Sequence, residues 1–128
     1  MITEDYVSFE VAKLLKEKGF DEPCRSYWAD NHFSSFEHTK LFVSNGDEPV
    51  CLLRPTLQMA MKWLRKTHKI HIQIWILEDN GYWFDIEKIV NAQYKHKSLY
   101  STGLEDIYFE SYEQACEAAI KYCLTNLI

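Results

Sequence analysis

The sequence predicts an α+β protein with an antiparallel sheet of about four or five strands and three helices packed mainly on one face of it. Apolar residues recur at helical spacing near residues 8–18, 57–68 and 112–126. Between the second and third of these segments, residues 70–89 show alternating apolar residues on both sides of a turn, which predicts a β-hairpin. The chain of 128 residues is expected to form a single domain, residues 1–128.

The first helix is predicted from Ser8 to about residue 18. Ser8 is a suitable N-cap, Val11, Leu14 and Leu15 form an apolar stripe, and Gly19 provides the stop. The following stretch, residues 20–54, is rich in turn-forming residues. It is expected to hold two short strands, near residues 25–29 and 39–44, and a loop at residues 45–49.

The second helix is predicted to begin after Pro55, with Thr56 as its N-cap, and to end near residue 68. An apolar stripe that includes Leu57, Met61 and Leu64 is expected to face the core. The opposite face is basic and carries Lys62, Arg65, Lys66 and, just beyond the helix, Lys69.

The register of the 70–89 hairpin decides which side chains share a face. A two-residue turn would place Asp85 and Glu87 on the isoleucine face, and burial of unpaired carboxylates is costly. A three-residue turn at residues 79–81, with Gly81 in the left-handed region, avoids this. That register pairs Glu78 with Tyr82 and Ile76 with Phe84, and it places Trp75 opposite Asp85.

The second face of the hairpin has an unusual composition, because it combines large aromatic side chains with acids. In the preferred register it carries His71, Gln73, Trp75 and Leu77 on one strand and Trp83, Asp85 and Glu87 on the next. Two interpretations remain open. Residues 20–54 or 91–104 cover this face, or it is an exposed aromatic surface that binds a partner.

The last third of the chain is expected to continue with a polar connection over residues 91–104. A short strand at residues 104–109 is predicted to follow, and Ser111 then caps a final helix over residues 112–126. The cysteines show no paired spacing. Cys116 and Cys123 are expected to be small core residues on one helix face, and neither a metal site nor a cofactor is predicted.

Composition and charge limit the classes of function. The formal net charge of −5 disfavours non-specific binding to nucleic acid, and no apolar run is long enough to span a membrane. The N-terminus lacks an apolar signal segment, so a cytoplasmic location is expected.

We expect a non-catalytic module that binds a protein partner, or itself, through the second hairpin face, because no nucleophile, phosphate loop or complete ligand set is visible. The alternative is nucleic-acid binding through the basic edge at Lys62, Arg65, Lys66 and Lys69.

Three stretches of the sequence resemble a known family, although none of them contains a chemical motif. VSFEVAKLLKEKGFDEP (7–23), RPTLQMAMKWLRKTHKIHI (54–72) and SYEQACEAAIKYCLTNLI (111–128) resemble a family of small uncharacterised proteins from gut Bacteroidetes and their phages or mobile elements. The resemblance implies a cytoplasmic accessory protein that is borne by a phage or mobile element. The family has no known activity, so no catalytic residue is carried over.

Overall fold

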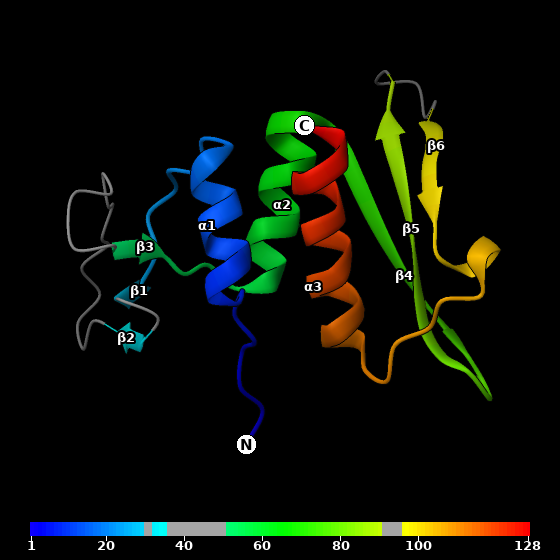
Figure 1. The fold of residues 1–128 in the computed structure, drawn as a ribbon, viewed down its shortest axis with the longest axis horizontal. Helices are drawn as coiled ribbons and strands as arrows, with labels where there is room; N and C mark the ends of the chain where they lie inside the picture. Colours follow the sequence, from blue (N-terminus) through cyan, green and yellow to red (C-terminus); the bar gives the residue numbers. More distant parts are fainter. Residues whose placement is uncertain (30–31, 36–50, 91–95) are drawn as a thin grey trace. The chain divides into compact units, whose positions relative to one another are not determined.

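The computed structural model describes residues 1–29, 32–35, 51–90 and 96–128 (Figure 1). Its contacts divide the chain into two compact units, Met1–Met59 and Ala60–Ile128, and each is described by itself. The prediction of a single domain stays a prediction. The strands form two separate antiparallel sheets, with the orders β2-β1-β3 and β4-β5-β6. The α+β class is therefore confirmed, whereas the prediction of one sheet of four or five strands is wrong.

Helix α1 (Phe9–Glu17) begins and ends where the sequence predicts. The Ser8 hydroxyl accepts a hydrogen bond from the Val11 N–H at 3.2 Å, which satisfies one of the free donors of the first turn. Gly19 follows with φ of +91°, a left-handed conformation that glycine adopts without steric cost. Val11, Ala12 and Leu15 are buried, so the apolar stripe packs as expected.

The sheet of the first unit consists of β1 (Ser26–Ala29), β2 (His32–Ser35) and β3 (Cys51–Leu53). The strand predicted at residues 25–29 is confirmed as β1, but β2 and β3 were not predicted. The strand predicted at 39–44 and the loop at 45–49 lie outside the described residues. The sequence pattern could not reveal β3, because three residues are too few to show an alternation of apolar and polar side chains.

The N-terminal segment of the first unit pairs with the chain just before α2 (Leu57–His68). The Val7 N–H donates to the Pro55 carbonyl at 3.1 Å, and the Leu57 N–H donates to the Asp5 carbonyl at 2.9 Å. The predicted N-cap of α2 is confirmed, since the Met59 N–H donates to the Thr56 hydroxyl at 3.0 Å. The side chains buried in this unit include Val7, Val11, Leu15, Phe20, Cys24, Leu52, Leu53 and Leu57.

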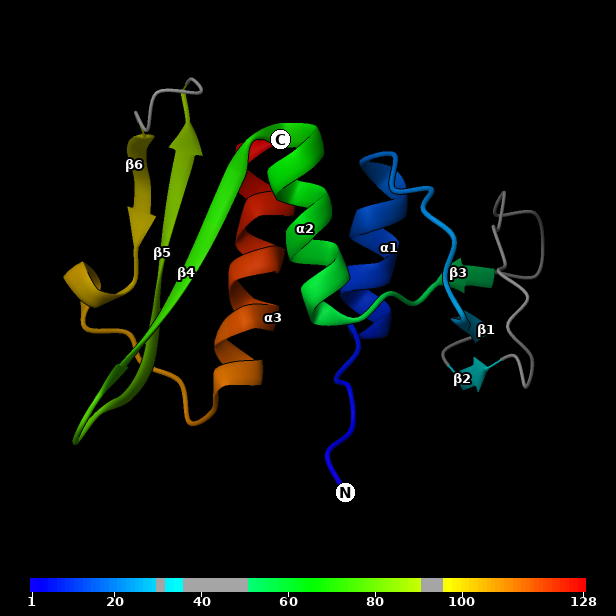
Figure 2. The same cartoon turned by 180° about the vertical axis from the view of Figure 1, so that it is seen from behind.

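The second unit is built on the sheet of β4 (Ile70–Leu77), β5 (Gly81–Ile89) and β6 (His96–Ser101). Helix α3 (Tyr112–Tyr122) lies along one face of this sheet, and the 3-10 turn η1 (Gly103–Glu105) lies on the other side (Figures 1 and 2). We call the face opposite α3 the outer face. Ile70, Ile72, Phe84 and Ile86 are buried on the α3 side, which confirms the predicted core face of the hairpin at these positions. The expectation that Ile76 also belongs to this core face is wrong, because Ile76 lies near the turn, where the exposed fraction of β4 is highest, and is 68 % exposed.

The pairing within the hairpin differs from the predicted register by two residues. Ile76 pairs with Tyr82 and Trp75 with Trp83, instead of Phe84 and Asp85, because the turn is Glu78–Asn80. The turn is closed by the Asn80 N–H, which donates to the Leu77 carbonyl at 3.1 Å. A shift of two residues preserves the faces, since side chains alternate with a period of two.

The segment after the hairpin corrects two further predictions. Residues 96–101 form strand β6 rather than a polar connection, and residues 103–105 form η1 rather than part of a strand at 104–109. In that predicted strand, an isolated bridge at Phe109 pairs with β5: the Tyr82 N–H donates to the Phe109 carbonyl at 2.9 Å, and the Phe109 N–H donates to the Tyr82 carbonyl at 2.7 Å. β5 is therefore bordered by β6 at one end and by Phe109 at the other.

Helix α3 packs its apolar stripe against β4 and β5. The Ser111 hydroxyl accepts from the Gln114 N–H at 3.1 Å, which confirms the predicted N-cap. A π-helical turn, η2 (Cys123–Leu127), continues the helix to the chain end. The fully buried side chains of the stripe are Ala115, Cys116, Ala119, Ile120, Cys123 and Leu124.

Candidate functional site

The outer face of β4 and β5 gathers the seven residues that the sequence singles out for binding. Alternation along each strand places them there, and the observed register keeps them together. The exposed fraction rises along β4, from buried Ile70 to an exposed end at Trp75, Ile76 and Leu77. The outer-face set is His71, Gln73, Trp75, Leu77, Trp83, Asp85 and Glu87.

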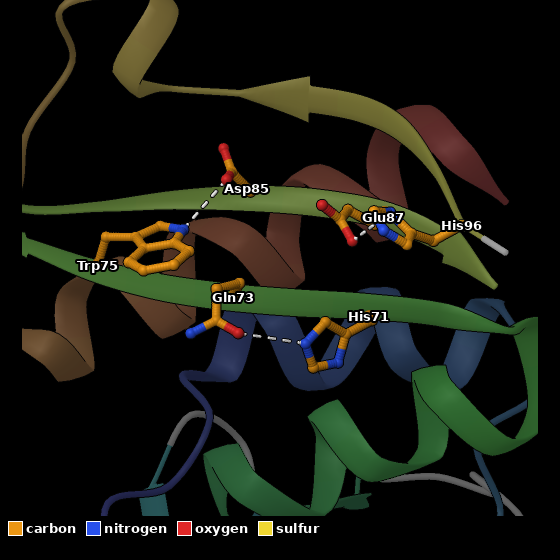
Figure 3. Close-up of polar contacts among 6 residues, drawn as sticks. All are labelled: His71, Gln73, Trp75, Asp85, Glu87 and His96. Carbon is orange, nitrogen blue, oxygen red and sulfur yellow. Dashed lines mark hydrogen bonds and ion pairs between the residues drawn. The ribbon is translucent and has the colours of Figure 1, made fainter. Parts of the chain in front are cut away.

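A stacked pair of tryptophans forms the centre of this face. Trp75 and Trp83 are direct cross-strand partners, and their ring centroids lie 5.8 Å apart with an interplanar angle of 21°. The Trp75 indole N–H donates to the Asp85 carboxylate at 3.0 Å, so its one polar group is satisfied (Figure 3). Trp75 nevertheless stays 46 % exposed, and Leu77 beside it stays 43 % exposed.

The chain covers part of the outer face and leaves part of it open. A Cβ added to Gly103 would lie 2.7 Å from the Trp83 ring, so the start of η1 rests directly on that indole. Trp83 is accordingly half-buried. The 91–104 segment therefore supplies a partial cover through residue 103, whereas Trp75 and Leu77 remain exposed. Residues 91–95 and most of the 30–50 region lie outside the description.

Polar side chains lie in separate pairs along the strands, on one side of Trp75 (Figure 3). His71 Nε2 lies 3.4 Å from Gln73 Oε1, and Glu87 forms an ion-pair contact of 2.9 Å with His96 Nδ1. Asp85 and Glu87 lie on the same face of β5 but bond to different partners, Trp75 and His96. The face thus combines apolar side chains at the turn end of the hairpin with a polar margin toward the other end of the strands, and interfaces combine both kinds of side chain.

The basic edge of α2 was the second candidate, and its side chains differ in their surroundings. Lys62, Lys66 and Lys69 are exposed and Arg65 is half-buried. The Lys69 ammonium donates to the Lys66 carbonyl at 3.3 Å, and the Lys88 ammonium of β5 donates to the His68 carbonyl at 2.9 Å. Both bonds satisfy carbonyls at the negative end of the helix dipole, which gives these two lysines a structural role.

His68, the last residue of α2, lies at the edge of the Trp63 ring, with centroids 4.9 Å apart. Burial lowers the pKa of His68 below its usual value, and the nearby Lys88 ammonium lowers it further. In the described part of the chain, the buried Nε2 atom of this ring has no hydrogen-bond partner. The neutral imidazole is therefore the form that suits this position.

Cys24, Cys116 and Cys123 are buried, as predicted for Cys116 and Cys123. Burial raises the pKa of Cys24 to about 12, with Glu22 adding to the shift, and burial raises that of Cys123 to about 12. Burial also raises the pKa of Cys116 to about 11. Thiols held in this protonated state are poor nucleophiles and poor metal ligands. Across the residues with described positions, no three His, Cys, Asp or Glu side chains gather closely enough to hold a metal ion.

Two contributors to the outer face escaped the sequence reasoning. His96 falls in the segment predicted as a connection, although the neighbouring Lys97 is a residue type that edge strands often carry. A register shift between Ile86 and Glu87 also disturbs the alternation that would have indicated pairing with β6. Gly103 gave no signal at all, since a glycine in a polar segment indicates only a turn.

Comparison of the chain with protein-family models, with curated proteins and with solved structures found no match. None of the helices in the described ranges has the length and apolar character that a membrane crossing requires.

Proposed function

We propose that this protein is a non-catalytic binding module that recognises a protein partner through the open part of its outer hairpin face. The observation that carries the proposal is the exposure of Trp75 and Leu77, 46 % and 43 %, on a regular strand. Large apolar side chains grouped on a rigid surface mark interaction sites more often than isolated ones do.

The surroundings of Trp75 support a binding role. Its ring is held by the stack on Trp83 and by the hydrogen bond to Asp85, so little side-chain freedom is lost when a partner covers it. Tryptophan is enriched among the residues that dominate binding energy at protein interfaces. The pairs His71–Gln73 and Glu87–His96 provide the polar margin that orients a partner.

The proposal is tested by photo-crosslinking in cells that produce the protein naturally. A photoreactive amino acid at position 77 should yield a discrete adduct with one protein species, and the same group at Glu113, which is exposed on α3, should not. Trp75→Ala in the position-77 background should reduce the adduct by about thirtyfold or more, since loss of an interface tryptophan costs about 2 kcal/mol or more.

The variants must keep their fold for the test to be valid. Trp83 is left unchanged, because it also supports Gly103 of η1. Far-ultraviolet circular dichroism and urea unfolding of Trp75→Ala establish that the sheet is intact. Equal crosslinking from positions 77 and 113, or an adduct insensitive to Trp75→Ala in a folded variant, contradicts the proposal.

A second candidate function is nucleic-acid binding through α2. This candidate is favoured by two exposed lysines, Lys62 and Lys66, which lie one helical turn apart. Neither lysine forms an ion pair within the described ranges, so both charges can contact phosphates. The protein should then bind single- or double-stranded DNA or RNA with an affinity that falls steeply with salt. Lys62→Gln with Lys66→Gln should reduce the salt slope by about 2. Absence of binding at low salt ends this candidate.

A further inference from the structure

Strand β4 is an edge strand of the second sheet as the described residues build it. In the order β4-β5-β6, β4 pairs with β5 on one side, and no other strand in the described ranges pairs with it. At eight residues, IHIQIWIL, it is long for an edge strand. It contains no proline, glycine, lysine or acid, and it has no bulge in its pairing with β5. Edge strands normally carry a charged residue, a proline or a bulge, because each of these features hinders pairing with another chain.

The register identifies which backbone groups face the free edge. The Ile89 N–H donates to the Lys69 carbonyl at 2.8 Å, so residue 69 directs its polar groups toward β5. With a period of two, residues 71, 73, 75 and 77 do the same, and the N–H and C=O groups of Ile70, Ile72, Ile74 and Ile76 point outward. The Gln73 side-chain amide approaches the Ile74 carbonyl at 3.5 Å, as expected for a group on that edge.

The apolar side chains at the end of the same strand are unusually exposed. Trp75, Ile76 and Leu77 are consecutive and 46, 68 and 43 % exposed. Ile76 points toward the α3 side, but at this position it is not covered. Three consecutive exposed apolar residues on an edge strand favour association with other chains unless they are covered.

We propose that β4 pairs with β4 of a second copy of this chain, antiparallel about a two-fold axis at Ile74, to form a continuous six-stranded sheet. The charges at the two ends of the strand point to this occupant. β4 is preceded by Lys69 and followed by Glu78 and Asp79. In an antiparallel pair the basic end of each strand adjoins the acidic turn of the other, whereas a parallel pair would bring Lys69 next to Lys69.

The same charges select one register. With the axis at Ile74, Lys69 lies beside Asp79 and Ile72 pairs with Ile76 of the other copy. The outward backbone groups then meet as hydrogen-bonded pairs, and faces are preserved because the axis is perpendicular to the sheet. The exposed Ile76 gains an apolar neighbour on the α3 side. On the outer face Trp75 lies next to Gln73 and Leu77 next to His71, so two copies of the candidate binding face become one surface.

The edge contact is independent of the proposed function, which uses the outer face of a single copy. The two are separated by amide exchange. Nuclear magnetic resonance spectra recorded at low and high protein concentration should show protection rising with concentration at the N–H groups of Ile72, Ile74 and Ile76. A contact through the outer face alone would leave these amides unchanged.

Sedimentation velocity gives the oligomeric state and allows matched variants. Ile76→Lys should shift the protein to monomer at concentrations where the wild type is dimeric, with at least about a tenfold rise in the dissociation constant, since one buried apolar side chain per copy is replaced by a charge. Leu104→Lys is the control. Leu104 is 88 % exposed on η1, away from the β4 edge, and its change should have no effect.

A charge exchange tests the register itself. Lys69→Glu should weaken the dimer by roughly tenfold, because two ion pairs become two repulsive contacts. Adding Asp79→Lys should restore association, whereas adding Asp106→Lys should not. A protein that is monomeric at all accessible concentrations overturns the proposal. A dimer whose three amides stay unprotected, or that the charge exchange does not restore, overturns it as well.

Discussion

Trp75 and Trp83 lie directly opposite each other on β4 and β5 with their rings stacked, yet they differ in what covers them. Trp83 supports Gly103 of η1, whereas Trp75 ends the stack at the open surface. One ring thus belongs to the packing of the second unit, and the other is half exposed. Substitutions at the two positions should therefore separate stability from binding.

We expect Trp83→Ala to lower the free energy of unfolding by about 2 kcal/mol or more, because it removes the support beneath η1 as well as the stack. Trp75→Ala should cost about 1 kcal/mol, since that ring is half exposed and loses the stack and the bond to Asp85. Urea unfolding of both variants checks the order. A larger loss of unfolding free energy for Trp75→Ala than for Trp83→Ala would contradict this prediction, because it would mean that the exposed ring contributes more to stability than the covered one.

Gly81 allows a comparison with a second glycine in the same conformation. Gly19 and Gly81 have φ of +91° and +97°, but a Cβ at Gly81 would come within 2.4 Å of the Phe109 carbonyl oxygen, and nothing lies within 4 Å at Gly19. Gly19→Ala should cost about 1 to 2 kcal/mol from backbone strain. Gly81→Ala should cost at least about 1 kcal/mol more, because the Phe109 segment must move. Equal losses in urea unfolding would contradict the close approach.

Thr102 is buried and joins η1 to the centre of β5. Its hydroxyl accepts from the Phe84 N–H at 2.9 Å and approaches the Phe84 carbonyl as a donor at 3.3 Å. Thr102→Val keeps the shape but leaves that N–H without a partner, so stability should fall by about 1 to 3 kcal/mol. Thr102→Ser retains the hydroxyl and should lose clearly less. Similar losses in the two variants would assign the effect to packing instead of the hydrogen bonds.

His68 should make stability depend on pH. Its pKa in the folded protein is lowered, chiefly by burial and also by Lys88, so the unfolded chain binds a proton more readily. The stabilisation is complete above the unfolded pKa of about 6.5 and is lost as the pH falls from there through the lower folded pKa. His68→Gln should reduce the change of the free energy of unfolding with pH across that interval, as measured by urea unfolding at a series of pH values. An unchanged slope would show that other groups cause the dependence.

The sequence determines the faces of the hairpin more firmly than its pairing. Two acids at positions 85 and 87 exclude one parity, which places Trp75, Trp83 and Asp85 together whatever the turn. The exact partners depend on whether residue 78 or residue 79 starts the turn, and the residues around Gly81 permit both. A shift of two residues therefore leaves the faces correct and the pairs wrong.

Helix ends were predictable because their signals are local. Ser8, Thr56 and Ser111 each cap the helix that the pattern assigns to them. Strand β6 and the division into two sheets were not predictable in this way. The division into two sheets depends on which strands pair in three dimensions, and the register shift between Ile86 and Glu87 disturbs the alternation that would have indicated β6.

One edge of β5 pairs with two segments of the chain, β6 and Phe109. Between them, the Thr102 hydroxyl is hydrogen-bonded to the Phe84 N–H of β5. Between these fixed points, η1 exposes Leu104 almost fully. The Leu104 side chain therefore takes little part in the packing of η1 on Trp83. A peptide epitope or a fluorescent reporter inserted after Leu104 would sit beside the tryptophans of the outer face, where it could signal their occupation without changing a single strand pair.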